Sequence, residues 1–353
     1  MQQDVSISES GAPTLAEKVA FLSRPSAYGP PVEHVVVRET HMSWVFLAGD
    51  RVYKLKKPVR LPYLDFSTLR RREAACRAEI DLNRRLAPDV YLGVSPLMAS
   101  PQGLSIGDHG TVADWLVIMR RLEERWALDR AIEENRVSPA QLDRLVVTLG
   151  RFYRRARRPY VCPAAQLVEW HRNISANCHV LLDRRLNLPS GIIRSIEHAQ
   201  RRFLGERPER LVKRIRDRRI VDGHGDLRPE HVWLTDGIKI IDCLEFNARL
   251  RTVDPFYEIA YLSLECQLLG APWIGDYVTR GVSRALHDDP PPDLILFYRC
   301  HHAMLRARLA IAHLLEPNPR TPETWPQRAR AYLRIGAADA ASLRELLRRP
   351  GGQ

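Results

Sequence analysis

The stretch VDGHGDLRPEHVWLTDGIKIIDCLEF, residues 221–246, constrains the fold of this 353-residue chain more than any other segment. It alternates short apolar runs with one polar loop, a pattern that predicts strand, loop, strand, tight turn and strand. The Asp-Gly pair between two apolar runs is a strong hairpin signal. Asp226 and Asp242 border this hairpin at the ends of short strands. We therefore expect the chemistry of the chain to be carried out here.

The composition fits a globular protein with one large core or two lobes, since 45% of the residues are hydrophobic. The net charge is +12 and arginine supplies most of it. Such a balance favours anionic partners such as nucleotides or phosphorylated metabolites. Arginine in place of lysine is equally well explained as a compositional habit of the genome. The positive charge is spread over several predicted helices, which argues against nucleic acid as a partner.

The six cysteines lie far apart and include no Cys-x-x-Cys pair, so neither a zinc site nor a redox dithiol is indicated. No apolar run approaches the ~20 residues that a membrane span needs. The chain shows no signal peptide, and we expect reduced thiols, a cytoplasmic location and no membrane partner.

Elements change along the chain from strands to helices. Residues 1–12 are small and polar and predict a flexible tail. Residues 13–120 are rich in strand patterns with one embedded helix, and residues 121–349 are mainly helical around the loop 222–246. Capping-box spacings at Thr14 and Ser138 predict the starts of two helices. The sequence therefore predicts an α+β protein with a small strand-rich N-terminal lobe and a larger helical C-terminal lobe.

This combination suits phosphoryl transfer, which needs cations on the phosphates, a carboxylate for a divalent metal ion, and a base for the acceptor hydroxyl. Asp226 lies in a loop where it can accept the proton, and Asp242 follows a strand where it can hold the metal ion. Lys54 lies on a strand of the first lobe and can pair with phosphate oxygens. A lysine in this position needs an acidic partner, which the helix over residues 67–86 offers as Glu73 or Glu79.

The motif HGDLRPEHVWL resembles the HGDLHPxN loop of aminoglycoside phosphotransferase-like kinases, which have a protein-kinase-like fold. Ile-Asp before residue 243 resembles their metal motif, DPFYEIA (254–260) their Asp-Pro helix start, and VIMRRL (117–122) their hinge. The stretches ETHMSWVFLAGDRVYKLKKP and DCLEFNARLRTVDPFYEIAYLSLEC resemble a bacterial branch of this superfamily that is often fused to a C-terminal P-loop kinase domain. The resemblance covers about residues 15–315.

The resemblance implies a role for each matching residue. Asp226 is implied as catalytic base, Asp242 as metal ligand, Lys54 as the phosphate-binding lysine and Glu79 as its partner. The backbone from Met119 to Arg121 is implied to bind adenine. The implied cofactors are ATP, or another nucleoside triphosphate, and Mg²⁺, with Mn²⁺ as the alternative.

Two of these residues have competitors. Glu79 is preferred to Glu73 because the run from Glu79 to Leu86 matches the family's helix. Lys56 shares a strand face with Lys54 and is the runner-up for the phosphate lysine.

Three departures from the family pattern stand out. The family has Asn five residues after the base, where this chain has His231. If His231 binds a metal ion, its ligand atom is a nitrogen, which is softer than the Asn oxygen. The alternatives are that His231 hydrogen-bonds Asp226 or contacts phosphate. No glycine-rich phosphate loop is present, so the hydroxyls and backbone amides of residues 40–43, ending at Ser43, must bind the phosphates in its place. No GxxxxGK[ST] motif occurs, so we expect that the fused kinase domain is missing and that a separate P-loop kinase can be a partner protein.

The sequence thus predicts an ATP-dependent phosphotransferase that acts on a hydroxyl of a small molecule. The basic balance of the chain favours a neutral or anionic acceptor over the polycationic aminoglycosides. The alternative is a catalytically weak nucleotide-binding regulatory protein, a pseudokinase, which the His231 departure and the missing glycine loop favour.

Overall fold

The computed structural model describes residues 13–61, 63–107, 109–312, 314 and 323–348. The chain forms two compact units: a sheet unit of residues 1–124 and 239–248, and a helical unit of residues 125–238 and 249–353. The predicted tail over residues 1–12 lies outside the described residues. The predicted 222–246 stretch is divided between the units, so Asp226 belongs to the helical unit and Asp242 to the sheet unit.

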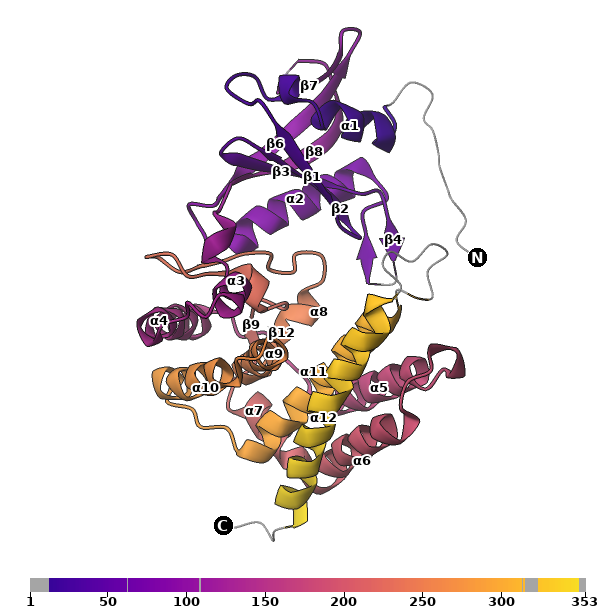
Figure 1. Ribbon diagram of the computed structural model, residues 1–353, viewed down its shortest axis with the longest axis vertical. Coiled ribbons are helices and arrows are strands. Elements are labelled where there is room, and N and C mark those ends of the chain that lie inside the picture. The colour runs from indigo at the N-terminus through magenta and orange to yellow at the C-terminus, as the bar shows by residue number, and fades with distance from the viewer. Residues whose placement is uncertain (1–12, 62, 108, 313, 315–322, 349–353) are drawn as a thin grey trace. The chain divides into compact units, whose positions relative to one another are not determined.

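The sheet unit is built on six antiparallel strands in the order β1-β2-β3-β8-β6-β7 (Figure 1). β3 lies inside the sheet, between β2 and β8, and therefore presents its alternate side chains to two faces. The strands are β1 (Val35–Glu39), β2 (Ser43–Ala48), β3 (Arg51–Lys56), β6 (Tyr91–Ser100), β7 (Gly103–Ile106) and β8 (Thr111–Arg120), with a small hairpin of β4 (Arg60–Leu61) and β5 (Leu64–Asp65).

Two apolar clusters hold the sheet unit together. The first packs α1 (Leu15–Leu22) onto the sheet through Leu22 and Phe46. The second packs α2 (Leu69–Asn83) against β6 and β8 through Cys76 and Ile80, and Ile241 joins this cluster. Because Ile241 is anchored there, the residue that follows it, Asp242, is held beside α2 and the sheet.

The helical unit surrounds a short antiparallel pair, β9 (Val221–Asp222) with β12 (Thr252–Val253). α11 runs beside α12, and α9 lies against α10 and α11 (Figure 1). Its principal helices are α3 (Leu128–Glu133), α4 (Pro139–Arg155), α5 (Pro163–Leu181), α6 (Ser190–Glu206), α7 (Pro208–Arg216), α9 (Pro255–Leu268), α10 (Pro272–Leu286), α11 (Pro292–Ala312) and α12 (Thr324–Arg348). The β10 strand (Val232–Trp233) belongs to this unit, β11 (Lys239–Ile240) belongs to the sheet unit, and α8 (Ala248–Arg251) spans the division.

Local sequence rules explain several of these boundaries. The predicted capping boxes are confirmed: the Thr14 hydroxyl accepts from the Glu17 amide at the start of α1, and Ser138 does the same with Gln141 at the start of α4. Asp254 caps α9, and Pro255 fills the first helical position, where no amide hydrogen is needed.

All six cysteines lie in the described part of the chain as free thiols, five of them buried and Cys162 exposed. Within the described ranges, no helix combines the length and the apolar character that crossing a membrane requires.

Candidate active site

Lys54 lies at the centre of a buried charge network in the sheet unit. Its Nζ donates to Glu79 Oε1 at 2.9 Å and to Asp242 Oδ1 at 2.8 Å. Glu73, the competing carboxylate, instead pairs with Arg77 one turn away on the exposed face of α2. The structure therefore brings together the three residues that the sequence named for phosphate and metal binding in this lobe.

Lys56 contacts the same glutamate from the other side. Its Nζ donates to Glu79 Oε2 at 2.5 Å and also to the Glu245 carboxylate. The side chains of Lys56 and Glu79 are 1% and 0% exposed, whereas that of Asp242 is 45% exposed. The network is thus closed at the Lys56 end and accessible at the Asp242 end.

Opposing effects set the pKa values in this network. Burial alone lowers the pKa of Lys54, but Asp242 and Glu79 outweigh it and hold that pKa well above its usual value. Burial alone raises the pKa of Glu79, but Lys54 and Lys56 outweigh it and lower that pKa. Burial raises the pKa of Glu245 in spite of Lys56. Lys54 is therefore a cation and Glu79 an anion at neutral pH.

The backbone around Asp242 is fixed by side chains of the sheet unit. The Asp242 amide donates to Tyr91 Oη at 3.0 Å, and the Cys243 amide donates to Asn83 Oδ1 at 2.9 Å. Asp242 adopts a φ of 63°, in the left-handed region that only Gly, Asn and Asp enter readily. A strained backbone at an accessible carboxylate is typical of functional sites.

In the structure, the residues of this unit that are predicted to contact adenine and phosphate bind or pack against other residues of the sheet unit. Met119 is in β8, where its side chain packs in the α2 cluster. The Arg121 amide donates to the Asp50 carbonyl at 2.8 Å. Ser43 is buried, and its amide donates to Thr40 Oγ1 at 2.9 Å. Nucleotide binding at Met119, Arg121 and Ser43 stays a prediction.

Glu258 on α9 holds the loop that follows β9 in the helical unit. Its carboxylate accepts from the amides of His224, at 2.8 Å, and Gly225, and also from Tyr153 Oη at 2.9 Å. Glu258 is 3% exposed. A side chain at Gly223 would lie 2.7 Å from Glu258 Oε2, so only glycine allows this approach. The sequence reasoning missed this role, although Glu258 stands one turn after Asp254 in the DPFYEIA motif.

Arg228 lies between the predicted base and His231. Its Nε donates to Asp226 Oδ2 at 3.1 Å and its NH1 pairs with Glu230 at 2.6 Å. Arg228 NH2 lies 3.2 Å from His231 Nε2, and because a guanidinium can only donate, Nε2 accepts. His231 Nδ1 then carries the hydrogen and donates to the Asp226 carbonyl at 2.8 Å. His231 thus braces the loop through both of its ring nitrogens.

The ligand atoms that Asp242 and His231 offer can be compared with those that a divalent metal ion prefers. Asp242 offers hard carboxylate oxygens on a half-exposed side chain, which fits Mg²⁺ with water and phosphate as the other ligands. His231 uses Nε2 to accept from Arg228, so the geometry gives its predicted metal role no support. Among the described residues, no three His, Cys, Asp or Glu side chains are grouped to hold a metal ion.

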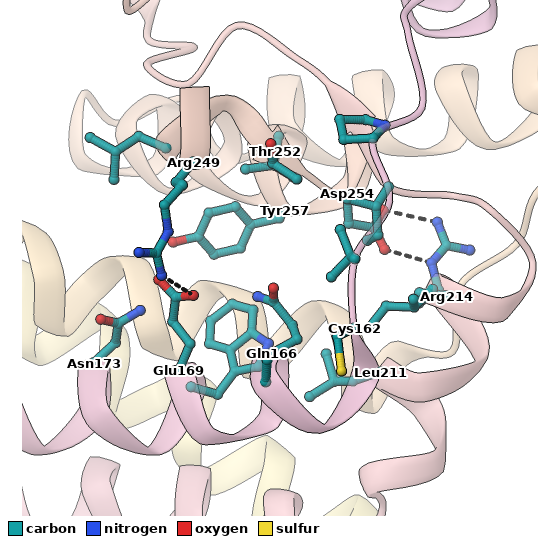
Figure 2. Close-up of a pocket in the computed structure, with 18 of the residues that line it drawn as sticks. Cys162, Gln166, Glu169, Asn173, Leu211, Arg214, Arg249, Thr252, Asp254 and Tyr257 are labelled. Carbon is teal, nitrogen blue, oxygen red and sulfur yellow. Dashed lines mark hydrogen bonds and ion pairs between the residues drawn. The ribbon is translucent and has the colours of Figure 1, made fainter. Parts of the chain in front are cut away.

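A cavity of about 330 Å³ lies within the helical unit (Figure 2). One end carries the ion pair of Arg249 with Glu169, at 3.0 Å, and the other carries the ion pair of Asp254 with Arg214. The Tyr257 ring and the Gln166 amide lie between the two pairs, as Figure 2 shows. The charges in the wall cancel in pairs, and the volume is that of a small-molecule site. The sequence could not predict this cavity.

The sheet with its Lys–Glu pair and accessible aspartate, together with the helical unit and its HGDL loop, defines the class as a phosphotransferase of protein-kinase-like fold. The chain belongs to the phosphotransferase enzyme family, whose profile matches residues 48–295. The predicted family and the predicted fold class, with a strand-rich N-terminal lobe and a helical C-terminal lobe, are confirmed.

An uncharacterized protein of Mycobacterium tuberculosis H37Rv is 35% identical over 290 residues, which cover 80% of this chain and 56% of that protein. An uncharacterized protein of Mycobacterium bovis gives the same values. The chain therefore spans about half the length of the curated relatives it matches.

Solved structures share the fold at low sequence identity. A choline/ethanolamine kinase family protein from Mesorhizobium loti is 17% identical, with a TM-score of 0.51 over 91% of this chain and 94% of that one. A GDP complex of a mutant aminoglycoside 2'-phosphotransferase-IIIa is 15% identical, with a TM-score of 0.52 over 90% and 95% of the two chains. At these identities the likeness shows the fold alone.

Proposed function

We propose that the protein transfers the γ-phosphoryl group of ATP, or of another nucleoside triphosphate, to a hydroxyl of a small molecule. The observation that carries this proposal is the Lys54–Glu79–Asp242 array, whose accessible end is a carboxylate. The reaction forms an ester bond between the acceptor oxygen and phosphorus, breaks the bond from phosphorus to the ADP oxygen, and releases one proton. A fold relative that is a GDP complex supports a nucleotide as donor.

Residues of the sheet unit are proposed to bind the donor. Lys54 moves its cationic Nζ from Asp242 to phosphate oxygens, and Glu79 keeps it aligned. Asp242 would hold Mg²⁺, or Mn²⁺, and such an ion supplies neutralisation of phosphate charge. The predicted contacts of Met119 and Arg121 with the base, and of Ser43 with phosphate, belong to the same proposal.

Residues of the helical unit are proposed to act on the acceptor. Asp226 accepts the proton of the attacking hydroxyl, because its carboxylate stands on a loop whose amides Glu258 fixes. Arg228 keeps Asp226 oriented until the acceptor takes its place. His231 fixes the Asp226 carbonyl and so the direction of the loop.

We further propose that the acceptor binds in the cavity of the helical unit. Its wall includes Thr252 and Val253 of β12, the strand that pairs with β9 directly before the Asp226 loop. Because Arg249 is paired with Glu169 and Arg214 with Asp254, the wall presents no uncompensated charge. A neutral acceptor with a ring-shaped or otherwise apolar body and several hydroxyl groups fits this lining.

The test uses the whole protein, ATP labelled in its γ-phosphate, Mg²⁺ and a panel of neutral polyols, sugars and nucleosides. We expect label in one class of acceptor, transfer slowed about 10²–10⁴-fold in Asp226→Asn, and a raised acceptor KM with unchanged ATP KM in Gln166→Leu. His171→Leu, on the exposed face of the same helix and outside the cavity wall, serves as the matched control for a change of polarity. Bound nucleotide without transfer or hydrolysis in any metal, and Asp226→Ala like wild type, would contradict the proposal.

The pseudokinase alternative has one observation in its favour. Arg228 forms an ion pair with the proposed base and donates to His231, which stands where the family has Asn. In a pseudokinase this pair is permanent, so Arg228→Gln leaves turnover absent. In a kinase Arg228 only orients the base, and the same variant keeps measurable transfer with a changed acceptor KM.

A further inference from the structure

The sheet unit contains a second buried lysine that the proposed reaction leaves without a role. Lys54 and Lys56 are two residues apart on β3 and so face the same side of the sheet. Each binds one oxygen of the Glu79 carboxylate. Lys54 continues to Asp242, while Lys56 continues to Glu245. One glutamate on α2 is therefore shared by two lysines, each with its own second carboxylate.

The two lysines differ in their surroundings. Lys56 is 1% exposed and also lies over the Phe66 ring, with Nζ 5.0 Å from the ring centroid. Lys54 is 15% exposed and contacts Asp242, the accessible member of the network. A ligand that approaches Asp242 can thus reach Lys54, whereas Lys56 is enclosed by its partners.

We propose that Lys56 is a positioning residue: it remains on Glu79 and Glu245 as their fixed counter-ion and thereby allows Lys54 to leave Asp242 for the phosphates. This inference rests on the proposed function, because it gives Lys54 a phosphate to bind. It also assigns different roles to Lys54 and Lys56, which the sequence alone could not distinguish.

The physical reason is the charge left behind when Lys54 moves. Glu79 is fully buried, and a buried carboxylate without a cation is strongly disfavoured. With Lys56 in place, Glu79 keeps one ion pair throughout. Without Lys56, Glu79 and Glu245 both depend on Lys54, which is then held more tightly in the network and is less available to phosphate.

A second contribution comes from the anchoring of the Asp242 segment. Glu245 lies three residues after Asp242, and its carboxylate is held by Lys56 of β3. Tyr91 and Asn83 hold the backbone between them. The Lys56–Glu245 pair therefore fixes the distance between the Asp242 segment and the strand that carries Lys54.

The experiment measures the affinity of the full chain for MgATP and for adenosine by calorimetry. We expect Lys56→Met to weaken MgATP binding by at least about tenfold and to leave adenosine binding within about twofold, because only the phosphates need Lys54. Lys18→Met is the matched control: Lys18 is a buried lysine of the same unit, paired with Asp114 at 2.8 Å. It should lower the melting temperature while both affinities stay at the wild-type level.

A double variant protects the test against a folding failure. Lys56→Met with Glu245→Leu replaces the ion pair by apolar side chains, which proteins often tolerate without loss of stability. It still leaves Glu79 with Lys54 alone, so we expect the same selective loss of MgATP affinity.

Three results would overturn the inference. MgATP affinity equal to that of Lys18→Met would show that Lys56 is structural only. Equal weakening of MgATP and adenosine would show a general distortion of the unit. Loss in Lys56→Met as complete as in Lys54→Met would make Lys56 itself the phosphate ligand. Absence of MgATP binding by the wild-type protein would instead refute the proposed function, and the inference with it.

Discussion

Glu258 is predicted to order the loop that carries Asp226, and Glu258→Gln tests this role. The glutamine keeps the shape of the side chain but replaces one acceptor oxygen by an NH₂ group. Both backbone amides, of His224 and Gly225, donate to the same oxygen, Oε1, so the glutamine oxygen takes that place and its NH₂ group faces Tyr153 Oη, which can accept. The substitution therefore keeps three hydrogen bonds but removes the negative charge from each of them.

The magnitude follows from these contacts. A net hydrogen bond to a charged group contributes about 1.5–3 kcal/mol, and one between neutral groups about 0.5–1.5 kcal/mol. Because three hydrogen bonds each change from the charged to the neutral kind, we expect a loss of about 3 kcal/mol in the free energy of unfolding. The loop amides should lose protection first, since they are the groups whose acceptor loses its charge.

Two measurements check this prediction: urea unfolding, and hydrogen exchange of the peptide that contains residues 223–226. The control is Glu265→Gln, since Glu265 is equally buried on α9 but binds the side chains of Arg306 and Tyr332 instead of the amides of residues 223–226. We expect both variants to be destabilised, but only Glu258→Gln to exchange faster at residues 223–226. Unchanged exchange there in Glu258→Gln would refute the bracing role.

Two further predictions concern histidines. His231→Asn should leave the preference between Mg²⁺ and Mn²⁺ unchanged in a metal titration of activity, because Nδ1 of His231 donates to the Asp226 carbonyl and Nε2 accepts from Arg228, so both ring nitrogens already have protein partners; a shift toward Mg²⁺ would instead restore the metal-ligand role. Burial, with a smaller effect of Arg308, lowers the pKa of His301 from 6.5 to about 3. As the pH falls, the unfolded chain therefore protonates His301 before the folded protein does. The free energy of unfolding is at its full value above pH 6.5 and decreases as the pH is lowered, by about 2 kcal/mol at pH 5. In His301→Gln, urea unfolding at pH 7 and pH 5 should show a loss smaller by this amount, and the same loss in both proteins would contradict the assignment.

Much of the sheet unit could be predicted because its signals are local. Capping boxes fix helix starts within four residues, and strand alternation places Lys54 and Lys56 on one face. Which lysine is enclosed could not be predicted, because Glu245 reaches Lys56 from a segment about 190 residues away in the sequence. Burial of that kind depends on tertiary packing and leaves no local pattern.

In the helical unit, too, local features could be predicted from the sequence and tertiary contacts could not. The motif around Asp226 identified the loop, but not the contacts made within it. A 3₁₀ turn at Pro229–His231 brings the Arg228 side chain to His231 three residues on, a contact that a loop prediction does not contain. The cavity is formed by side chains from α5, α7, β12 and α9, and helix patterns give the faces of single helices but not which faces meet.

The central claim is that Asp226 and Asp242 perform separate tasks in one phosphoryl transfer. The most direct measurement compares Asp226→Asn with Asp242→Asn for MgATP affinity and for the rate of phosphoryl transfer or ATP hydrolysis. We predict that Asp226→Asn binds MgATP like the wild-type protein and loses about 10²–10⁴-fold in rate, as expected for a missing base. Asp242→Asn should lose MgATP affinity itself. Equal effects of the two variants on affinity, or an unchanged rate in Asp226→Asn, would contradict the account.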